Sequence, residues 1–236
     1  MRQVISDRSS GILLHISSLP GSYGVGDIGH AINFIDFLVS AGQSYWQILP
    51  VNPTSPIFGN SPYMSFSAFA GNPLLISPDI LFQDGLLNKE DLAAPEFSPY
   101  LVEFERVIPW KQSVLNKAWQ HFQEKSDKTD FNKFCHDKEW LLAHALFMAL
   151  KNKYNQSPWY SWPEEIKSAN KKHLLVALDE LAGQIDYFRF EQYIFFRQWQ
   201  ILHDYAVDKG VKIIGDLPIY VGTDSVDVWC SSNLDW

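Results

Sequence analysis

A carboxylate at the end of an apolar run and a tyrosine in a polar loop are the side chains best suited to chemistry. Asp216 follows residues 211–215 (VKIIG), which are typical of a buried strand, and Pro218 prevents further strand pairing. Residues 59–72 (GNSPYMSFSAFAGN), with Ser61 and Tyr63, form a loop of small, polar and aromatic residues. Loops of this kind commonly hold sugar rings, so the two segments together indicate carbohydrate chemistry.

Each of these residues also has a purely structural interpretation. Asp216 could bind backbone amides, although active-site carboxylates in barrels of parallel strands also occupy strand ends. Ser61 precedes a proline and could serve only a turn. Tyr63 could pack in a core, as most aromatic side chains do. His15, at the end of the first apolar run, faces either a ligand or the rim of the core, and Asp224 could simply cap a helix.

Other catalytic and binding patterns are absent or incomplete. Residues 24–29 (GVGDIG) match G-x-G-x-x-G, which leaves a dinucleotide-binding redox enzyme as an alternative. However, seven residues separate this motif from the preceding strand, and residues 47–50 (QILP) lack the acid that binds a ribose. The histidines and cysteines have no metal-binding spacing, and no G-x-S-x-G motif occurs. We therefore expect neither a metal nor an organic cofactor.

Composition narrows the partners further. The 236 residues carry a net charge of −8 without a basic run, which argues against nucleic acid. No stretch approaches the ~20 apolar residues of a membrane span. The first ten residues lack the apolar core of a secretory leader, and two cysteines cannot form a disulfide framework. We expect a cytoplasmic protein that binds neither nucleic acid nor membrane.

The elements that position Asp216 and Tyr63 follow a β/α pattern. Residues 11–16 and 45–49 are expected strands, and residues 31–39 between them have the apolar spacing of a helix that Gly42 ends. A glycine-containing loop, residues 17–29, leads into that helix. A helix at 186–208 then precedes the third strand, and its two apolar faces predict deep burial. Three parallel strands buried on both faces fit either a (β/α) barrel or a doubly wound sheet.

The long stretch between the second and third strands cannot be a structureless loop. Residues 139–152 and 165–183 have helical patterns, so we expect a mainly helical subdomain. The predicted organisation is therefore residues 1–50 as the start of a barrel, 51–185 as the inserted subdomain with a substrate loop at 56–73, and 186–236 as the continuation of the barrel.

Five blocks of the chain resemble one known family. They are GILLHISSLPG (11–21), YWQILPVNPTS (45–55), GNSPYMSFSAFAGNP (59–73), QYIFFRQW (192–199) and GDLPIYVGTDSVDVW (215–229). In this order they resemble the 4-alpha-glucanotransferases, also called amylomaltases, of glycoside hydrolase family 77. The resemblance implies a catalytic (β/α)₈ barrel of which this chain holds the first three strands. It also implies transfer of an α-1,4-glucan segment to the 4-hydroxyl of an acceptor glucan or glucose.

The resemblance implies roles for particular residues as well. Tyr63 matches a tyrosine that stacks on the sugar at the cleavage point, Ser61 matches a polar contact beside it, and Asp216 matches an aspartate that supports the active site. Phe58 and Asn60 stand where the family commonly has tyrosine and aspartate, so Phe58 is only a possible substrate contact. His15, at the end of the first expected strand, is a second possible contact.

The resemblance also implies that the catalytic carboxylates are elsewhere. The family's nucleophile Asp lies in an R-x-D motif near the fourth strand, and its acid/base Glu follows later, so both are expected beyond Trp236. Residues 189–191 (RFE) lie in a predicted helix and lack the strand context. We expect the chain alone to be inactive, with a non-catalytic α-glucan-binding remnant as the alternative.

Overall fold

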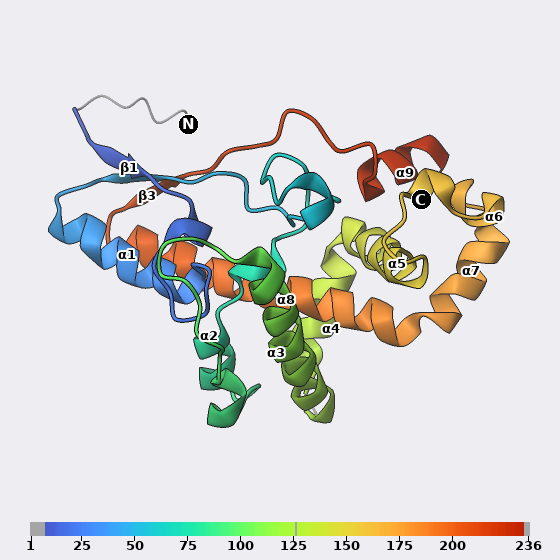
Figure 1. The fold of residues 1–236 in the computed structure, drawn as a ribbon, viewed down its shortest axis with the longest axis horizontal. Helices are drawn as coiled ribbons and strands as arrows, with labels where there is room; N and C mark the ends of the chain where they lie inside the picture. The colour runs from blue at the N-terminus through green and yellow to red at the C-terminus, as the bar shows by residue number, and fades with distance from the viewer. Residues whose placement is uncertain (1–7, 126, 234–236) are drawn as a thin grey trace.

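Figure 1 shows the computed structural model, which describes residues 8–125 and 127–233. Three parallel strands form one sheet in the order β1 (Gly11–Leu13), β2 (Tyr45–Gln47) and β3 (Lys212–Ile214). This confirms three parallel strands. Each is shorter than predicted, and the chain already turns into a 3₁₀ helix at Ile16–Ser18.

The sheet is covered by helices on one face only. Ile12, Trp46 and Ile213 are paired in register and pack against the main core. On the other face, Leu13 and Ile214 are 59% and 41% exposed. The expectation that the strands are buried on both faces is therefore wrong.

The strand order explains why one face stays open. Helix α1 (Ile28–Ser40) connects β1 to β2, and α8 (Ala182–Asp208) precedes β3. Right-handed crossovers that advance in one direction across a sheet place every helix on the same side. A doubly wound sheet needs a reversal of strand order to cover its second face, and the order β1-β2-β3 contains none.

Helix α1 begins within the glycine motif. Asp27 is its N-cap, and the carboxylate accepts hydrogen bonds from the backbone N–H groups of Gly29 and His30. The predicted loop at 17–29 therefore ends two residues early. Gly42, with φ of 68°, follows the helix in the left-handed conformation, as predicted.

Helices dominate the chain between β2 and β3, as expected, although the domain boundaries drawn from the sequence remain predictions. Helices α5 and α8 extend the predicted segments 139–152 and 186–208. The other helices are α2 (Pro78–Gln83), α3 (Phe104–Glu124), α4 (Thr129–Asp137), α5 (Glu139–Lys153), α6 (Glu164–Lys167), α7 (Lys171–Glu180) and α9 (Val226–Asn233), with 3₁₀ helices at Pro56–Phe58, Pro73–Leu75, Lys89–Leu92 and Trp159–Ser161.

Helix α8 joins two hydrophobic clusters. Its C-terminal part, with Phe195 and Leu202, packs with the sheet, α1 and α3. Its N-terminal part, with Ile185 and Phe188, packs with α5, α7 and α9. Figure 1 shows α8 running the length of the molecule between these groups. The prediction that this helix is deeply buried is confirmed for residues 190–195, whereas Ile201 and Val207 near its C-terminal end are 44% and 64% exposed.

The open side of the sheet predicts self-association. Leu217 and Ile219, just beyond β3, are 83% and 90% exposed, and exposed apolar surface next to an unpaired strand edge favours association. We expect the mass measured by sedimentation to rise with concentration, and Leu217→Lys with Ile219→Lys to reduce that rise. Val207→Lys on α8, also an exposed apolar position, is the control. A monomer at every concentration would contradict the prediction.

Candidate functional site

Tyr63 and Asp216 meet directly although 153 positions separate them. The Tyr63 hydroxyl donates a hydrogen bond of 2.9 Å to Asp216 Oδ2. This bond, together with slight burial and the charge of Asp216, raises the pKa of Tyr63 above its usual value. Tyr63 is 45% exposed, so one face of its ring remains available. Two residues past β3, Asp216 therefore holds an aromatic ring that is open to solvent.

The turn before Tyr63 uses the polar side chains that the sequence singles out. Ser61 Oγ accepts a hydrogen bond of 3.3 Å from the Tyr63 backbone N–H, which agrees with its interpretation as a turn residue. Gly59 and Asn60 both have positive φ, 62° and 55°. Phe58 packs against Phe66, with ring centroids 5.2 Å apart. Ser61 and Phe58 thus shape the loop that carries Tyr63.

Side chains from distant elements hold the rest of the 56–73 loop. The Asn52 amide donates to the backbone carbonyls of Ser67, Ala68 and Ala70 at 2.9–3.2 Å. Gln192 on α8 both donates to and accepts from the Gly71 backbone, at 3.0 and 2.8 Å. A buried loop without regular structure needs such partners for its backbone groups. The sequence does not reveal these two residues, because the pairing is formed only in the folded chain.

A second pair of contacts fixes the chain beyond Asp216. The backbone N–H of Val226 donates to Phe66 O at 2.9 Å, and the backbone N–H of Ala68 donates to Asp227 Oδ2, also at 2.9 Å. Burial raises the pKa of Asp227 above its usual value, against the opposite effect of hydrogen bonds from the backbone N–H groups of Ala68 and of Asp227 itself. Thus the 56–73 loop contacts the following chain at Asp216 and again at Val226 and Asp227.

Asp224 is a salt-bridge partner and not a helix cap. Its Oδ2 lies 2.7 Å from Nζ of Lys151, and both side chains are buried. Ser225 instead precedes α9, and its hydroxyl accepts a hydrogen bond from the Val228 N–H. The expected cap therefore falls one residue later than predicted, and the sequence gives no indication of Lys151.

His15 lies apart from the Tyr63–Asp216 contact. It lines a cavity of about 120 Å³ with Ser17, Thr54 and Asn60. Burial lowers the pKa of His15 to about 4, so the ring is neutral at pH 7. Among the hydrogen bonds of the described residues, none joins His15 to Tyr63 or Asp216. A role for His15 in substrate binding remains a prediction.

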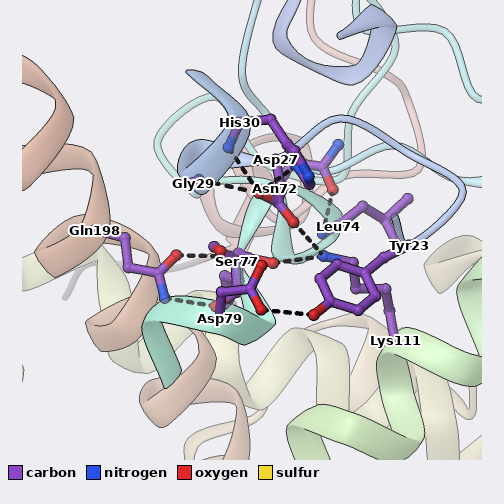
Figure 2. Close-up of polar contacts among 11 residues, drawn as sticks. Tyr23, Asp27, Gly29, His30, Asn72, Leu74, Ser77, Asp79, Lys111 and Gln198 are labelled. Carbon is purple, nitrogen blue, oxygen red and sulfur yellow. Dashed lines mark hydrogen bonds and ion pairs between the residues drawn. The ribbon is translucent and has the colours of Figure 1, made fainter. Parts of the chain in front are cut away.

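The glycine motif leads into a buried charge cluster (Figure 2). Lys111 of α3 is fully buried; its Nζ donates to Ile76 O at 2.6 Å and lies 3.5 Å from Asp27 Oδ2. Burial raises the pKa of Asp27, but Lys111 and His30 outweigh it and hold that pKa below its usual value. The carboxylate thus fills the helix N-terminus that a phosphate would occupy, which disfavours a dinucleotide site.

A larger cavity of about 750 Å³ lies between the 56–73 loop and helices α3, α5 and α8. Its lining includes Glu191, which accepts a hydrogen bond of 2.7 Å from Tyr187, and His144, whose Nδ1 has no hydrogen-bond partner. Burial raises the pKa of Glu191 to about 7, and burial lowers the pKa of His144 to about 4. As predicted, residues 189–191 lie within a helix. The functional interest of Glu191 and His144 is not visible in the sequence.

Two further features of the described residues bear on function. No cluster of three or more His, Cys, Asp or Glu side chains there has an arrangement that could hold a metal ion. Likewise, within residues 8–125 and 127–233 no helix is both long and apolar enough to cross a bilayer. The expectation about a secretory leader, drawn from the first ten residues, falls mostly on residues 1–7, which lie outside the described part.

Tyr63 and Asp216 thus place an exposed aromatic ring, held by a carboxylate, just beyond a strand end in a chain with parallel β/α units. A sequence model of glycoside hydrolase family 77, 4-alpha-glucanotransferase, matches residues 14–234. The chain belongs to this family. It is 47% identical over 225 residues to a 4-alpha-glucanotransferase of Clostridium butyricum and 44% identical over 232 residues to one of Streptococcus pneumoniae.

Solved structures show the same fold. The amylomaltase of Streptococcus agalactiae, in complex with acarbose, superimposes with a TM-score of 0.90 at 40% identity, over 94% of this chain and 46% of that one. The amylomaltase of Corynebacterium glutamicum, at 19% identity and a TM-score of 0.66, is similar in fold. The Clostridium and Streptococcus pneumoniae matches cover 94% and 96% of this chain but only 46% of each relative. This chain therefore spans about half the length of these relatives.

The buried histidine predicts an acid-sensitive fold. Because the pKa of His144 is about 4 in the folded chain and 6.5 when unperturbed, its stabilising effect is present above pH 6.5 and is lost as the pH falls. We expect the free energy of unfolding, measured with urea, to fall between pH 7 and 5 by about 2 kcal/mol more in the wild type than in His144→Leu.

His15 and Glu191 titrate in both proteins, so the difference isolates His144. His136→Leu, at an exposed position, is the matched control and should behave as the wild type. The same pH dependence in wild type and His144→Leu would show that His144 is not held neutral by burial.

Proposed function

We propose that this chain forms the N-terminal part of the catalytic barrel of a 4-alpha-glucanotransferase and contributes the Tyr63–Asp216 pair to its glucan site. The observation that carries the proposal is the 2.9 Å hydrogen bond between these residues, made at the end of β3 in a chain that belongs to this family. Catalytic residues in β/α barrels lie at the carboxyl ends of strands, where Asp216 lies. The acarbose bound to the related amylomaltase also supports a carbohydrate ligand.

The arrangement of the sheet supports the proposal that β1, β2 and β3 are the first three strands of a barrel. Its helices cover one face, and the other face, with Leu13 and Ile214, is open to solvent. In a closed barrel this second face is the interior, which side chains of the remaining strands fill. On this view the helical residues 51–185 are an insertion that carries the 56–73 loop to the mouth of the barrel.

Tyr63 is suited to stack on a sugar ring. Aromatic faces pack against the apolar C–H faces of sugars, and the hydrogen bond to Asp216 limits rotation of the ring. A ring fixed in advance loses less conformational entropy when a ligand binds. Ser61 sets the turn that brings Tyr63 to Asp216. The cavity beneath the loop, at about 750 Å³, has room for further parts of a glucan chain.

The reaction we propose is transfer of an α-1,4-glucan segment, with retention, to the 4-hydroxyl of a second glucan or of glucose. Retention requires two carboxyl groups about 5–5.5 Å apart, one as nucleophile and one as acid/base. An acceptor hydroxyl resolves the glycosyl-enzyme instead of water when the site excludes water and positions the acceptor. We propose no cofactor, no nucleic acid or membrane partner, and a cytoplasmic location.

The first test is glucan binding. We expect calorimetry of the chain with maltoheptaose to show weak binding, and Tyr63→Ala to weaken it about 2- to 12-fold, if stacking on a sugar contributes the roughly 0.5–1.5 kcal/mol of stacked aromatic pairs. Asp216→Asn should weaken it less. Tyr100→Ala removes a tyrosine that is 94% exposed elsewhere and serves as the control. Equal losses in Tyr63→Ala and Tyr100→Ala would remove the proposed role of Tyr63.

The second test separates binding from catalysis. The 236 residues contain no R-x-D motif, and we propose that the family's nucleophile and acid/base do not lie among them. We expect residues 1–236 alone to leave maltotriose unchanged, as measured by chromatography of the sugars. Longer and shorter maltooligosaccharides that appear with this chain, and not with a heat-treated sample, would overturn that expectation. Binding without turnover would fit the non-catalytic alternative for the isolated chain.

A further inference from the structure

A second buried lysine lies next to the proposed glucan site. The Lys151 side chain on α5 is fully buried, and its ammonium group has three partners. It donates to the backbone carbonyls of Gln156 and Ser157 at 2.9 and 3.0 Å and to Asp224 Oδ2 at 2.7 Å. An ammonium group has three donors, so every donor of Lys151 is used.

Asp224 is equally well satisfied. Its second oxygen, Oδ1, accepts a hydrogen bond of 3.1 Å from the backbone N–H of Trp159. The Trp159 indole N–H in turn donates to Thr223 O at 2.7 Å. The Lys151–Asp224 pair therefore ties the chain just before α9 to α5 and to the 3₁₀ helix that begins at Trp159.

The same pair also reaches the loop that carries Tyr63. Nζ of Lys151 lies 4.9 Å from the centre of the Phe66 ring. Phe66 O accepts the N–H of Val226, two residues after Asp224. A Cβ at position 222 would lie only 3.3 Å from Ser65 O, so the segments around Gly222 and Ser65 are in close contact. The ion pair lies where the 56–73 loop and the chain beyond β3 are joined.

The chain between β3 and α9 has little else to fix it. Residues 215–225 form neither helix nor strand, and Leu217, Ile219 and Tyr220 are largely exposed. One end is held by β3 and the other by Asp224. Before Asp224, the side-chain hydrogen bond that joins this segment to the 56–73 loop is the exposed one between Tyr63 and Asp216, and an exposed bond of this kind is weak. The contacts of Val226 and Asp227 with the loop lie beyond Asp224.

We propose that Lys151 and Asp224 are positioning residues, which hold residues 215–225 against the 56–73 loop so that Asp216 meets Tyr63. This inference rests on the proposed function, because the Tyr63–Asp216 pair is the proposed glucan site. Neither Lys151 nor Asp224 is proposed to touch the sugar, since both side chains are buried.

The phenol pKa of Tyr63 reports the contact without any ligand, because the hydrogen bond to Asp216 raises it. It is measured by NMR with ¹³Cζ-labelled tyrosine, and Tyr63→Phe assigns the signal. Asp216→Asn gives the value without the carboxylate. We expect Lys151→Met and Asp224→Ala to lower the pKa of Tyr63 to that value, and Asp224→Asn, which keeps the shape and an accepting oxygen, to restore most of the difference.

Two further variants keep the test decisive. Removal of one partner leaves a buried charge unpaired and could unfold the chain, whereas removal of both does not. Lys151→Met combined with Asp224→Leu should therefore fold and still show the lowered pKa of Tyr63. The control is Lys153→Met, also on α5, which breaks an exposed pair of similar length, 2.8 Å, with Glu180 of α7. It should leave the pKa of Tyr63 unchanged.

A folded double variant in which the pKa of Tyr63 equals that of the wild type would overturn the proposal, because the pair would then be only structural. So would an equal shift in Lys153→Met. Calorimetry with maltoheptaose on the wild type is a separate measurement. Absence of glucan binding there would contradict the proposed function, while the NMR result would still decide whether Lys151 and Asp224 position Asp216.

Discussion

The structure depends on how the buried end of an irregular loop satisfies its backbone. Residues 70–72 and 74–77 are buried, so their N–H and C=O groups need partners within the protein. Gln192 and Gln198 on α8 each form two hydrogen bonds with one residue of this stretch, Gly71 and Ser77. Figure 2 shows the pair at Ser77. A glutamine amide has a donor and an acceptor on adjacent atoms, so it pairs with a peptide as a neighbouring strand would.

Position 71, where Gln192 binds the backbone, is a glycine for a steric reason. A Cβ on Gly71 would lie 1.9 Å from Phe195 Cδ1, so only glycine lets the loop approach α8 closely enough for Gln192 to reach it. Asn52 secures the other side of the same loop through three carbonyls. An exposed ring such as that of Tyr63 keeps a defined position because the loop that carries it is fixed from beneath.

The two buried lysines perform a related task with charge. Lys111 of α3 pairs with Asp27, which caps α1, and Lys151 of α5 pairs with Asp224, just before α9. Each lysine lies on a helix between β2 and β3. Each aspartate lies within two residues before the first residue of another helix. A buried ion pair contributes little net stability but makes the loss of one partner costly. These pairs therefore specify how the central helices contact the rest of the chain more than they add to stability.

The sequence was sufficient for the parts of the fold that depend on local pattern. Apolar runs and helical spacing predict three parallel strands and the helices α1, α5 and α8, and the order of motifs predicts the family. The sequence also singles out Asp216 and Tyr63, and the structure adds that the two side chains meet directly. Lys111, Lys151, Gln192 and Gln198 could not be found in this way, because a lysine or glutamine in a helical pattern is usually exposed. Their burial depends on long-range packing.

The exposed face of the sheet follows from the same long-range packing. Residues 211–215 form a mainly apolar run, and such a run is compatible with burial on both faces of a sheet. The order β1-β2-β3 places both helices on one side, so the second face needs a partner from outside these residues. Family relatives are about twice as long as this chain. Apolar side chains such as Ile214 on this open face fit the barrel proposed above, in which further strands would cover them.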